Sequence, residues 1–238
     1  MSQIKQLTVQ EESDDDDYLI LQNPGTGKTY CITKANFLAG LSSSSTISTW
    51  CSLLLTETTG TAAIDSSGNG RNGTYVNCTL DSTGVIFNGS SRVSLNNSNA
   101  ALSNFSIGID FKTSFNFNQG LWEFRASQDL SSGTFTPALT MNSAGNIAVY
   151  GYPSSSGYSS QTFKDNNWHK CIAILANGSI KVIVDKIKIL DVSANPITVF
   201  NGFFSIGATR ANGNFNGQLK NFRIWNQDIS EATAIQYT

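Results

Sequence analysis

Turns rich in glycine and asparagine punctuate this chain, and they constrain its fold more than any other feature. The densest turn, at residues 65–74 (DSSGNGRNGT), is followed by a short apolar run with polar ends at residues 84–93 (GVIFNGSSRV). Glycine and asparagine tolerate the positive φ angles of tight turns, and a short apolar run between turns is typical of a β-strand. Similar glycine-bearing turns recur from Gly60 to Gly213. The chain is therefore expected to contain many short strands.

The pattern between the turns predicts two packed antiparallel sheets. Residues 105–111 (FSIGIDF) alternate strictly, which indicates a strand with one buried and one solvent-exposed face. Only 39% of residues are apolar and 13% are charged, a balance that suits strands joined by polar turns better than a helical bundle. One helical pattern stands out, at residues 230–237, with Ser230 as its N-cap. We predict an all-β fold, a two-sheet antiparallel sandwich.

Charge and hydropathy exclude two classes of partner. The net charge is −2, and the basic residues are scattered rather than clustered to follow a phosphate backbone, so no nucleic-acid partner is expected. No apolar run approaches the roughly 18 residues that predict a membrane helix, so no membrane partner is expected. The first residues lack the apolar core of a signal peptide, and we expect the protein to stay in the cytoplasm in which it is made.

The first 45 residues differ from the rest of the chain. An acidic run at residues 11–17 precedes two short strand patterns, residues 18–22 and 29–33, which flank a turn and predict a β-hairpin. An isolated hairpin is only marginally stable, so we expect it to be covered by further copies of the chain, with a trimer as one arrangement, or by a larger scaffold. The residues expected to make this assembly contact are Tyr18, Leu19, Ile20, Leu21, Tyr30, Ile32, Phe37 and Leu38. The predicted domains are thus an anchor at residues 1–45 and a sandwich at residues 46–238.

Motifs across the sandwich resemble those of laminin-G-like (concanavalin-A-like) jelly-roll domains. The turn at residues 65–74 and the FNG-x-S strand that follows it resemble the opening of the family. The later matches are residues 102–111, 165–169 (DNNWH), 204–207, 215–225 and 228–230. The resemblance implies a jelly-roll sandwich. It implies no single function, because the fold carries lectins, adhesion modules, virion proteins and some glycosidases.

Calcium is the one metal that the resemblance suggests, because many laminin-G-like domains hold it near the sandwich rim. Asp65 and Asn69, in the glycine-rich turn, are the candidate ligands. The alternative is that both side chains only cap the backbone of their own turn. No other cofactor is expected.

The N-terminal residues resemble a second group, the N-terminal segments of bacteriophage tail, fibre and head-appendage proteins. The matching residues are 17–22, 25–27 and 30–37. This resemblance implies a structural protein of a tailed-phage virion that is assembled in the host cytoplasm. Its partners would be further copies of itself and other virion structural proteins.

The residues for catalysis are incomplete. Residues 23–29 (NPGTGKT) imitate a phosphate-binding loop, but Gln22 replaces its first glycine and a strand follows where a helix is needed. His169, the only histidine, is expected to pack and hydrogen-bond at a strand entry. A sandwich glycosidase needs two carboxylates on one face, yet Glu123 is followed at the same-face position by Arg125. We expect a non-enzymatic protein.

Carbohydrate binding remains open because tyrosines cluster near one loop. Tyr150, Tyr152 and Tyr158 lie in a stretch rich in serine and glycine, where they could offer aromatic faces to a sugar. The alternative is local packing of Tyr150 against Tyr152. Our first hypothesis is a virion structural protein (fibre, decoration or tail appendage) that is anchored by its N-terminus. The alternative is a carbohydrate-binding adhesin or lectin module that recognises host surface glycans.

Overall fold

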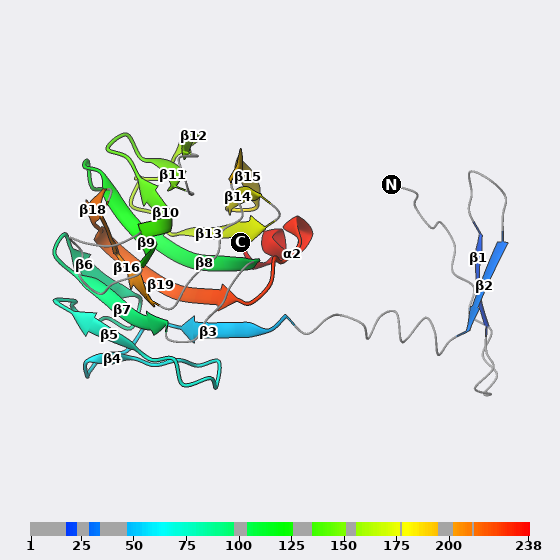
Figure 1. Ribbon diagram of the computed structural model, residues 1–238, viewed down its shortest axis with the longest axis horizontal. Coiled ribbons are helices and arrows are strands. Elements are labelled where there is room, and N and C mark those ends of the chain that lie inside the picture. The colour runs from blue at the N-terminus through cyan, green and yellow to red at the C-terminus, as the bar shows by residue number, and fades with distance from the viewer. Residues whose placement is uncertain are drawn as a thin grey trace. The chain divides into compact units, whose positions relative to one another are not determined.

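A computed structural model gives the fold of the protein (Figure 1). It describes residues 18–22, 29–33, 47–97, 104–125, 135–150, 156–176, 178–194, 202–210 and 212–238. The chain divides into two compact units, Met1–Ile47 and Ser48–Thr238.

The first unit contains the predicted hairpin. Strands β1 (Tyr18–Gln22) and β2 (Thr29–Thr33) pair antiparallel, with Tyr18 opposite Thr33 and Gln22 opposite Thr29. These bounds confirm the two strands expected from the sequence. In the part of the chain that the structure describes, this pair forms a sheet of its own. Phe37 and Leu38, two of the residues expected in assembly, lie outside the described residues.

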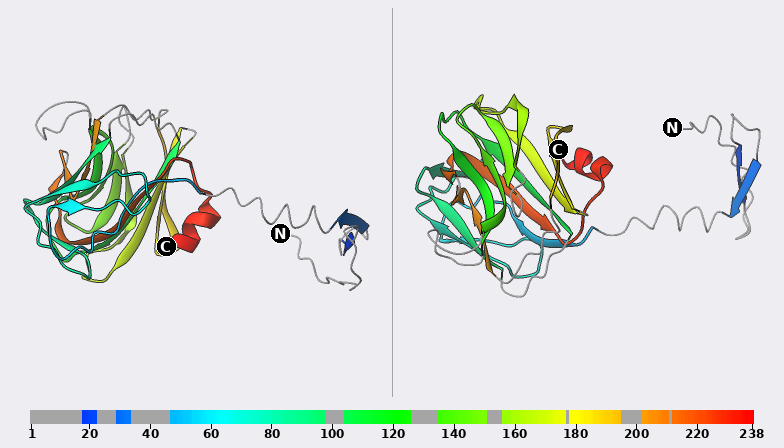
Figure 2. Two further views of the ribbon diagram at one scale, coloured as in Figure 1. Left: turned by 90° about the horizontal axis from the view of Figure 1, so that it is seen from below. Right: turned by 45° about the horizontal axis from the view of Figure 1, so that its top comes forward.

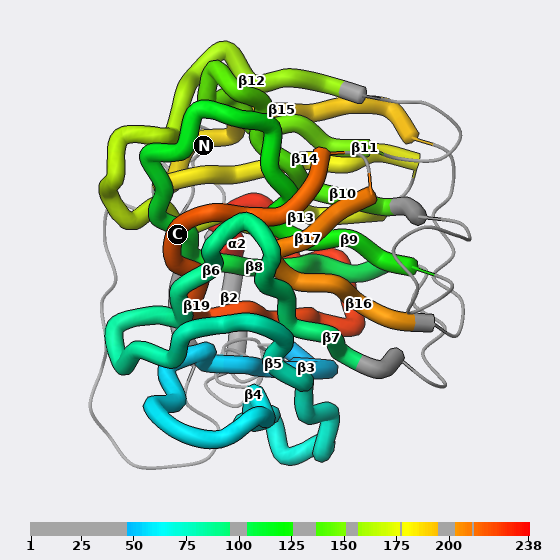
Figure 3. The backbone as a smooth tube through the Cα atoms, turned by 90° about the vertical axis from the view of Figure 1, so that its left-hand side faces the viewer, coloured from blue at the N-terminus to red at the C-terminus, as the bar shows by residue number. Residues whose placement is uncertain are grey.

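The second unit is a sandwich of two antiparallel sheets, which confirms the predicted fold class. The front sheet, in spatial order, contains β12 (Ser156–Thr162), β11 (Asn146–Tyr150), β10 (Phe135–Met141), β9 (Gln119–Arg125), β16 (Gly202–Ile206), β7 (Arg92–Asn97), β5 (Gly73–Val76) and β4 (Ala62–Ala63). The back sheet contains β15 (Ile187–Ser193), β14 (Ser179–Val184), β13 (His169–Ala176), β8 (Phe105–Lys112), β19 (Asn216–Trp225) and β3 (Thr49–Leu53), and β6 (Val85–Asn88) also pairs with β19. Strands of both sheets run in similar directions (Figure 3), as in aligned sandwiches.

Two small elements lie on the outer faces of the sheets. A short hairpin, β17 (Ala208–Thr209) and β18 (Gly213–Asn214), contacts β9 of the front sheet. The helix α2 (Glu231–Tyr237) contacts β14 of the back sheet (Figure 2). The Ser230 side chain accepts a hydrogen bond from the backbone N–H of Thr233 at 3.1 Å, which confirms the predicted cap.

Aromatic side chains fill the space between the sheets. The ring of Phe204 on β16 lies 5.4 Å from that of Phe124 and 6.4 Å from those of Trp50 and Phe222, measured between centroids. Phe124 and Phe204 belong to the front sheet, and Trp50 and Phe222 belong to the back sheet. These contacts therefore tie the two sheets together, and tilted or edge-on pairs of this kind add to the stability that burial alone supplies.

The prediction of a solvent-exposed face on β8 is wrong. Phe105, Ile107, Ile109 and Phe111 face the core as expected, but Ser106 on the opposite face is also fully buried. Trp225 and α2 lie over that face, and the Ser106 hydroxyl donates to Gln227 O at 3.1 Å. Side chains on both faces of β8 are therefore buried, and strict alternation in the sequence does not reveal the elements that cover the outer face.

Candidate functional site

The front sheet brings two of the predicted tyrosines together. Strand pairing places Tyr150 on β11 opposite Ala138, and Ala148 opposite Tyr158 on β12, so both tyrosines extend from the outer face. Their hydroxyl oxygens lie 3.3 Å apart. The Tyr158 side chain is 54% exposed, and Tyr150 is half-buried. We call Tyr150 and Tyr158 the tyrosine pair; Tyr152 lies outside the described residues.

A third side chain joins the tyrosine pair from a distant part of the sequence. The Asn212 amide, in the turn between β17 and β18, donates to the Tyr150 hydroxyl at 3.4 Å and to the Thr140 hydroxyl at 2.8 Å. Asn212 was not predicted, because nothing in the local sequence indicates that its side chain reaches β10 and β11. The result is an aromatic surface edged by hydroxyl and amide groups.

The phenol of Tyr158 stays protonated at neutral pH. The hydrogen bond to Tyr150 raises the pKa of Tyr158 above its ordinary value. A protonated phenol donates and accepts hydrogen bonds, and its ring offers an apolar face. Sugars present both C–H faces and hydroxyl groups, so this arrangement suits them.

The carboxylate on the same sheet is closed to solvent. Glu123 and Arg125 on β9 form an ion pair, and both side chains are buried, which confirms the predicted pairing. The backbone N–H of Arg210 also donates to Glu123 Oε2 at 2.8 Å. Burial raises the pKa of Glu123, while Arg125 and the hydrogen bond from Arg210 oppose that rise. A carboxylate that is enclosed in this way has no access to a substrate.

The histidine is held between two carboxylates. The Nδ1 atom of His169 lies 2.7 Å from Asp185 Oδ2, and its Nε2 atom lies 3.0 Å from Asp165 Oδ1. Its ring contacts the rings of Phe111 and Phe163 at centroid distances of 5.4 and 5.2 Å. Both ring nitrogens are thus engaged, as expected for a packing and hydrogen-bonding residue.

The turn that carries the candidate calcium ligands is held by hydrogen bonds to its own backbone and to the backbone of β3. Asp65 Oδ1 accepts from the N–H groups of Ser52 at 2.9 Å and Ser67 at 3.0 Å, and Oδ2 accepts from Arg71 N at 2.9 Å. These hydrogen bonds lower the pKa of Asp65, although partial burial opposes them. The amide of Asn69 donates to the carbonyl oxygens of Thr49 and Trp50. Both side chains therefore brace the turn against β3.

Two further features are absent from the described residues. They contain no group of three or more histidine, cysteine, aspartate or glutamate side chains that could hold a metal ion. They also contain no helix with the length and apolar character needed to cross a membrane.

Comparison with known proteins gives one family and a set of similar folds. The family model described as "Concanavalin A-like lectin/glucanases superfamily" matches residues 87–234. No curated protein matches the sequence. Domain 4 of AbnA, a GH43 extracellular arabinanase from Geobacillus stearothermophilus, was solved with arabinotriose. It is 15% identical, with a TM-score of 0.59 over 79% of this chain and 97% of its own.

Two other solved structures share the fold as part of a larger chain. Trypanosoma rangeli sialidase in complex with sialic acid is 11% identical, with a TM-score of 0.61 over 97% of this chain and 43% of its own. The binding domain of botulinum neurotoxin DC in complex with SialylT is 14% identical, with a TM-score of 0.55 over 80% of this chain and 52% of its own. At these identities the similarity establishes the fold alone. This chain spans less than half of the sialidase.

Proposed function

This chain belongs to the concanavalin A-like lectin/glucanases superfamily, and we propose that it is a non-catalytic carbohydrate-binding protein whose sugar site is the tyrosine pair. The observation that carries the proposal is the joining of Tyr150 and Tyr158 at 3.3 Å on the outer face of the front sheet, with Tyr158 largely exposed. Asn212 and Thr140 add polar groups at its edge. Ligand sites combine aromatic side chains with a few convergent polar groups, and the tyrosine pair offers both.

The buried state of Glu123 supports the non-catalytic part of the proposal. A retaining glycosidase holds two carboxyl groups about 5–5.5 Å apart, and an inverting one holds them about 6.5–9.5 Å apart. On β9 the position that would supply the second carboxyl holds Arg125, and both side chains are enclosed. This arrangement supports glycan binding without hydrolysis.

The similar folds are consistent with a role in binding. Domain 4 of the arabinanase was solved with arabinotriose, and the neurotoxin binding domain was solved with SialylT. Both are parts of larger proteins that engage a sugar. These neighbours support a glycan as the ligand class, and they leave the sugar to be identified by experiment.

We further propose that the protein displays this module on a tailed-phage virion, where residues 1–45 anchor it and copies of the chain associate. Two points support this proposal: the resemblance of residues 17–22 and 30–37 to phage tail, fibre and appendage segments, and a hairpin whose strands pair only with each other among the described residues. Open strand edges of such a hairpin suit addition to a neighbouring chain. The mass in solution of the full chain, beside a chain that begins at Ser45, tests it: the full chain should be oligomeric and the shorter one monomeric. Two monomers would contradict self-assembly.

Screening on a glycan array tests the binding site. The full chain should bind at least one glycan, and Tyr158→Ala should weaken that binding about two- to tenfold, because an aromatic contact contributes roughly 0.5–1.5 kcal/mol. Phe117→Ala is the matched control, since Phe117 is also an exposed aromatic residue, 66% accessible, outside the tyrosine pair. Equal losses in the two variants, or no glycan bound by the full chain, would overturn the proposal. Release of reducing sugar from a bound glycan would overturn its non-catalytic part.

A further inference from the structure

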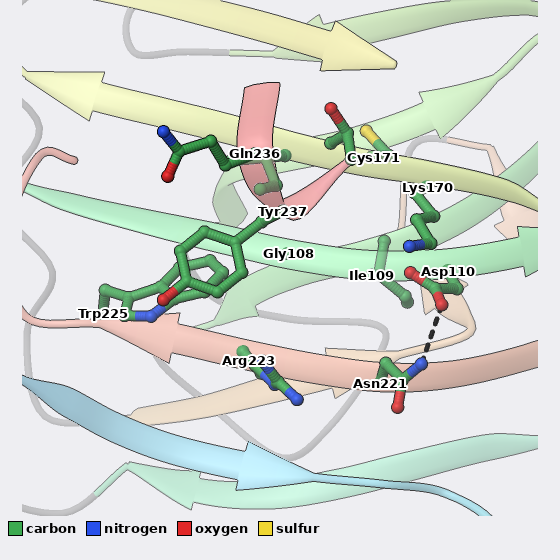
Figure 4. Close-up of a pocket in the computed structure, with 12 residues that line it drawn as sticks. Gly108, Ile109, Asp110, Lys170, Cys171, Asn221, Arg223, Trp225, Gln236 and Tyr237 are labelled. Carbon is green, nitrogen blue, oxygen red and sulfur yellow. Dashed lines mark hydrogen bonds between the residues drawn. The ribbon is translucent and has the colours of Figure 1, made fainter. Parts of the chain in front are cut away.

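A hollow of about 260 Å³ opens on the outer face of the back sheet, where the end of α2 lies beside β8, β13 and β19. In Figure 4, Trp225 and Tyr237 lie at one end of the hollow, Asp110 and Asn221 lie at the other, and Arg223 lies between them. The tyrosine pair belongs to the other sheet. The two sites are therefore separate.

The aromatic end presents a supported ring. The centroid of the Tyr237 ring lies 5.4 Å from that of Trp225, with 44° between the ring planes, and Tyr237 is 42% exposed. Trp225 is buried over Gly108, where a Cβ atom would approach the indole to 3.0 Å. Glycine at this position therefore allows the indole to lie close against β8, and the indole in turn supports Tyr237 from behind.

The polar end holds a carboxylate between cations. Asp110 is 9% exposed, and its Oδ2 accepts from the Asn221 amide at 2.7 Å. A β-bulge places Asn221 in a left-handed conformation, with φ of 53°, on the strand beside Asp110. Lys170 lies directly across from Asp110 on β13. Burial raises the pKa of Asp110, while Asn221 and Lys170 oppose that rise.

Arg223 supplies an unused donor. Its Nε atom is buried and has no hydrogen-bond partner within the described residues, although the side chain lines the hollow. A buried donor without a partner is unfavourable, so an acceptor is expected at this point. A carboxylate is the acceptor that matches a guanidinium best, because two parallel hydrogen bonds can form.

From these groups we propose that the hollow binds one hexuronic-acid residue, with its carboxylate on Arg223 and Lys170, its hydroxyls on Asp110 and Asn221, and its ring against Tyr237. Two cations against one carboxylate favour an acidic ligand over a neutral one. The volume lies below the roughly 300–1,000 Å³ of drug-sized sites, which suits a single sugar ring. The proposal goes beyond glycan binding at the tyrosine pair and does not depend on it.

Titration of the full chain with D-glucuronate, followed by calorimetry or ligand-observed NMR, tests this site. D-glucuronate should give saturable binding. D-glucose lacks the carboxylate, so its affinity should be at least roughly tenfold lower. Arg223→Gln should weaken binding of D-glucuronate roughly tenfold. Arg92→Gln, which removes the same charge from β7 of the front sheet, should leave binding unchanged.

A second variant keeps the test decisive. Lys170→Gln alters an exposed side chain, so this variant should fold and should bind D-glucuronate more weakly. It can therefore test the site even if the Arg223→Gln variant does not give a native circular-dichroism spectrum. Tyr158→Ala should bind D-glucuronate as the unaltered protein does, which separates this site from the tyrosine pair. Absence of saturable binding, equal binding of D-glucose, or full binding by the Lys170→Gln variant would overturn the proposal.

Discussion

The outer faces of the two sheets carry different chemistry. On the front sheet, the β17–β18 hairpin crosses β9, and the tyrosine pair lies beside its turn. On the back sheet, the end of α2 stands over β8 and β19 and leaves a hollow lined by Asp110 and Arg223. The tyrosine pair offers aromatic rings and hydroxyls, and the hollow offers charged side chains.

The segment that covers each outer face determines how far the carboxylate beneath it, Glu123 or Asp110, is enclosed. On the front sheet, Arg210 in the β17–β18 turn donates its N–H to Glu123, and Arg125 completes the enclosure. On the back sheet, α2 covers β8 only in part, and Asp110 stays at the wall of a hollow. In this protein, the crossing segment therefore encloses Glu123 and leaves Asp110 at the wall of the hollow.

The largest expected effect separates these two carboxylates. Glu123→Gln should lower the free energy of unfolding by about 3–5 kcal/mol, because it removes the carboxylate that forms an ion pair with the buried Arg125 side chain. Asp110→Asn should change it by less than about 1 kcal/mol, because asparagine keeps an acceptor for Asn221 and burial already disfavours the charge. Urea denaturation of both variants measures the difference. Similar losses would show that the two faces do not differ in this way.

A loss of intermediate size is expected at the glycine-rich turn, which belongs to neither face. Asp65→Ala removes the acceptor for three backbone N–H groups, and the free energy of unfolding should fall by about 2 kcal/mol. If the turn is held by its own hydrogen bonds, this loss should be the same with calcium and with a chelator. A calcium-dependent rise in the melting temperature of the unaltered protein, absent in Asp65→Ala, would instead make Asp65 a metal ligand.

The smallest effects concern pH, and the two carboxylates involved should act in opposite directions. Hydrogen bonds from Asn167 lower the pKa of Asp165 to about 2. The stabilisation from ionised Asp165 is therefore present above the ordinary aspartate pKa, and it is lost as pH falls toward about 2. Burial raises the pKa of Asp110, so the folded state favours the protonated form, and stability declines as pH rises through that raised value.

Melting temperatures across the acid range check both signs. Asp165→Asn should reduce the fall in melting temperature at the most acidic pH. Asp110→Asn should remove the fall in melting temperature that occurs as pH rises through the raised pKa of Asp110. Because Asp165 is largely exposed, salt should reduce its effect. The same pH profile in both variants would contradict the assigned directions.

Sequence alone predicted the parts of this protein that depend on local patterns. The alternation at residues 105–111 located β8, the Ser230 cap located the start of α2, and the spacing of Glu123 and Arg125 predicted that they share a face. Each of these depends on residues that are close in the chain. Glycine and asparagine at residues 65–74 similarly indicated a turn that its own side chains brace.

The remaining features depend on contacts between distant residues. Asn212 reaches Tyr150 from a separate hairpin, and Trp225 covers Gly108 only because β19 pairs with β8. No periodicity in the sequence encodes which loop crosses which strand. For the same reason, nothing in the sequence indicated the hollow beside α2, where Arg223 Nε has no hydrogen-bond partner among the residues that the structure describes.

The central claim is that a glycan binds at the tyrosine pair. An NMR titration of the isotopically labelled full chain, with the neutral glycan that gives the strongest array signal, tests it most directly. The account predicts saturable shifts that centre on Tyr150, Tyr158 and Asn212, and their loss in Tyr158→Ala. Shifts confined to other parts of the chain, or no shifts at all, would contradict it.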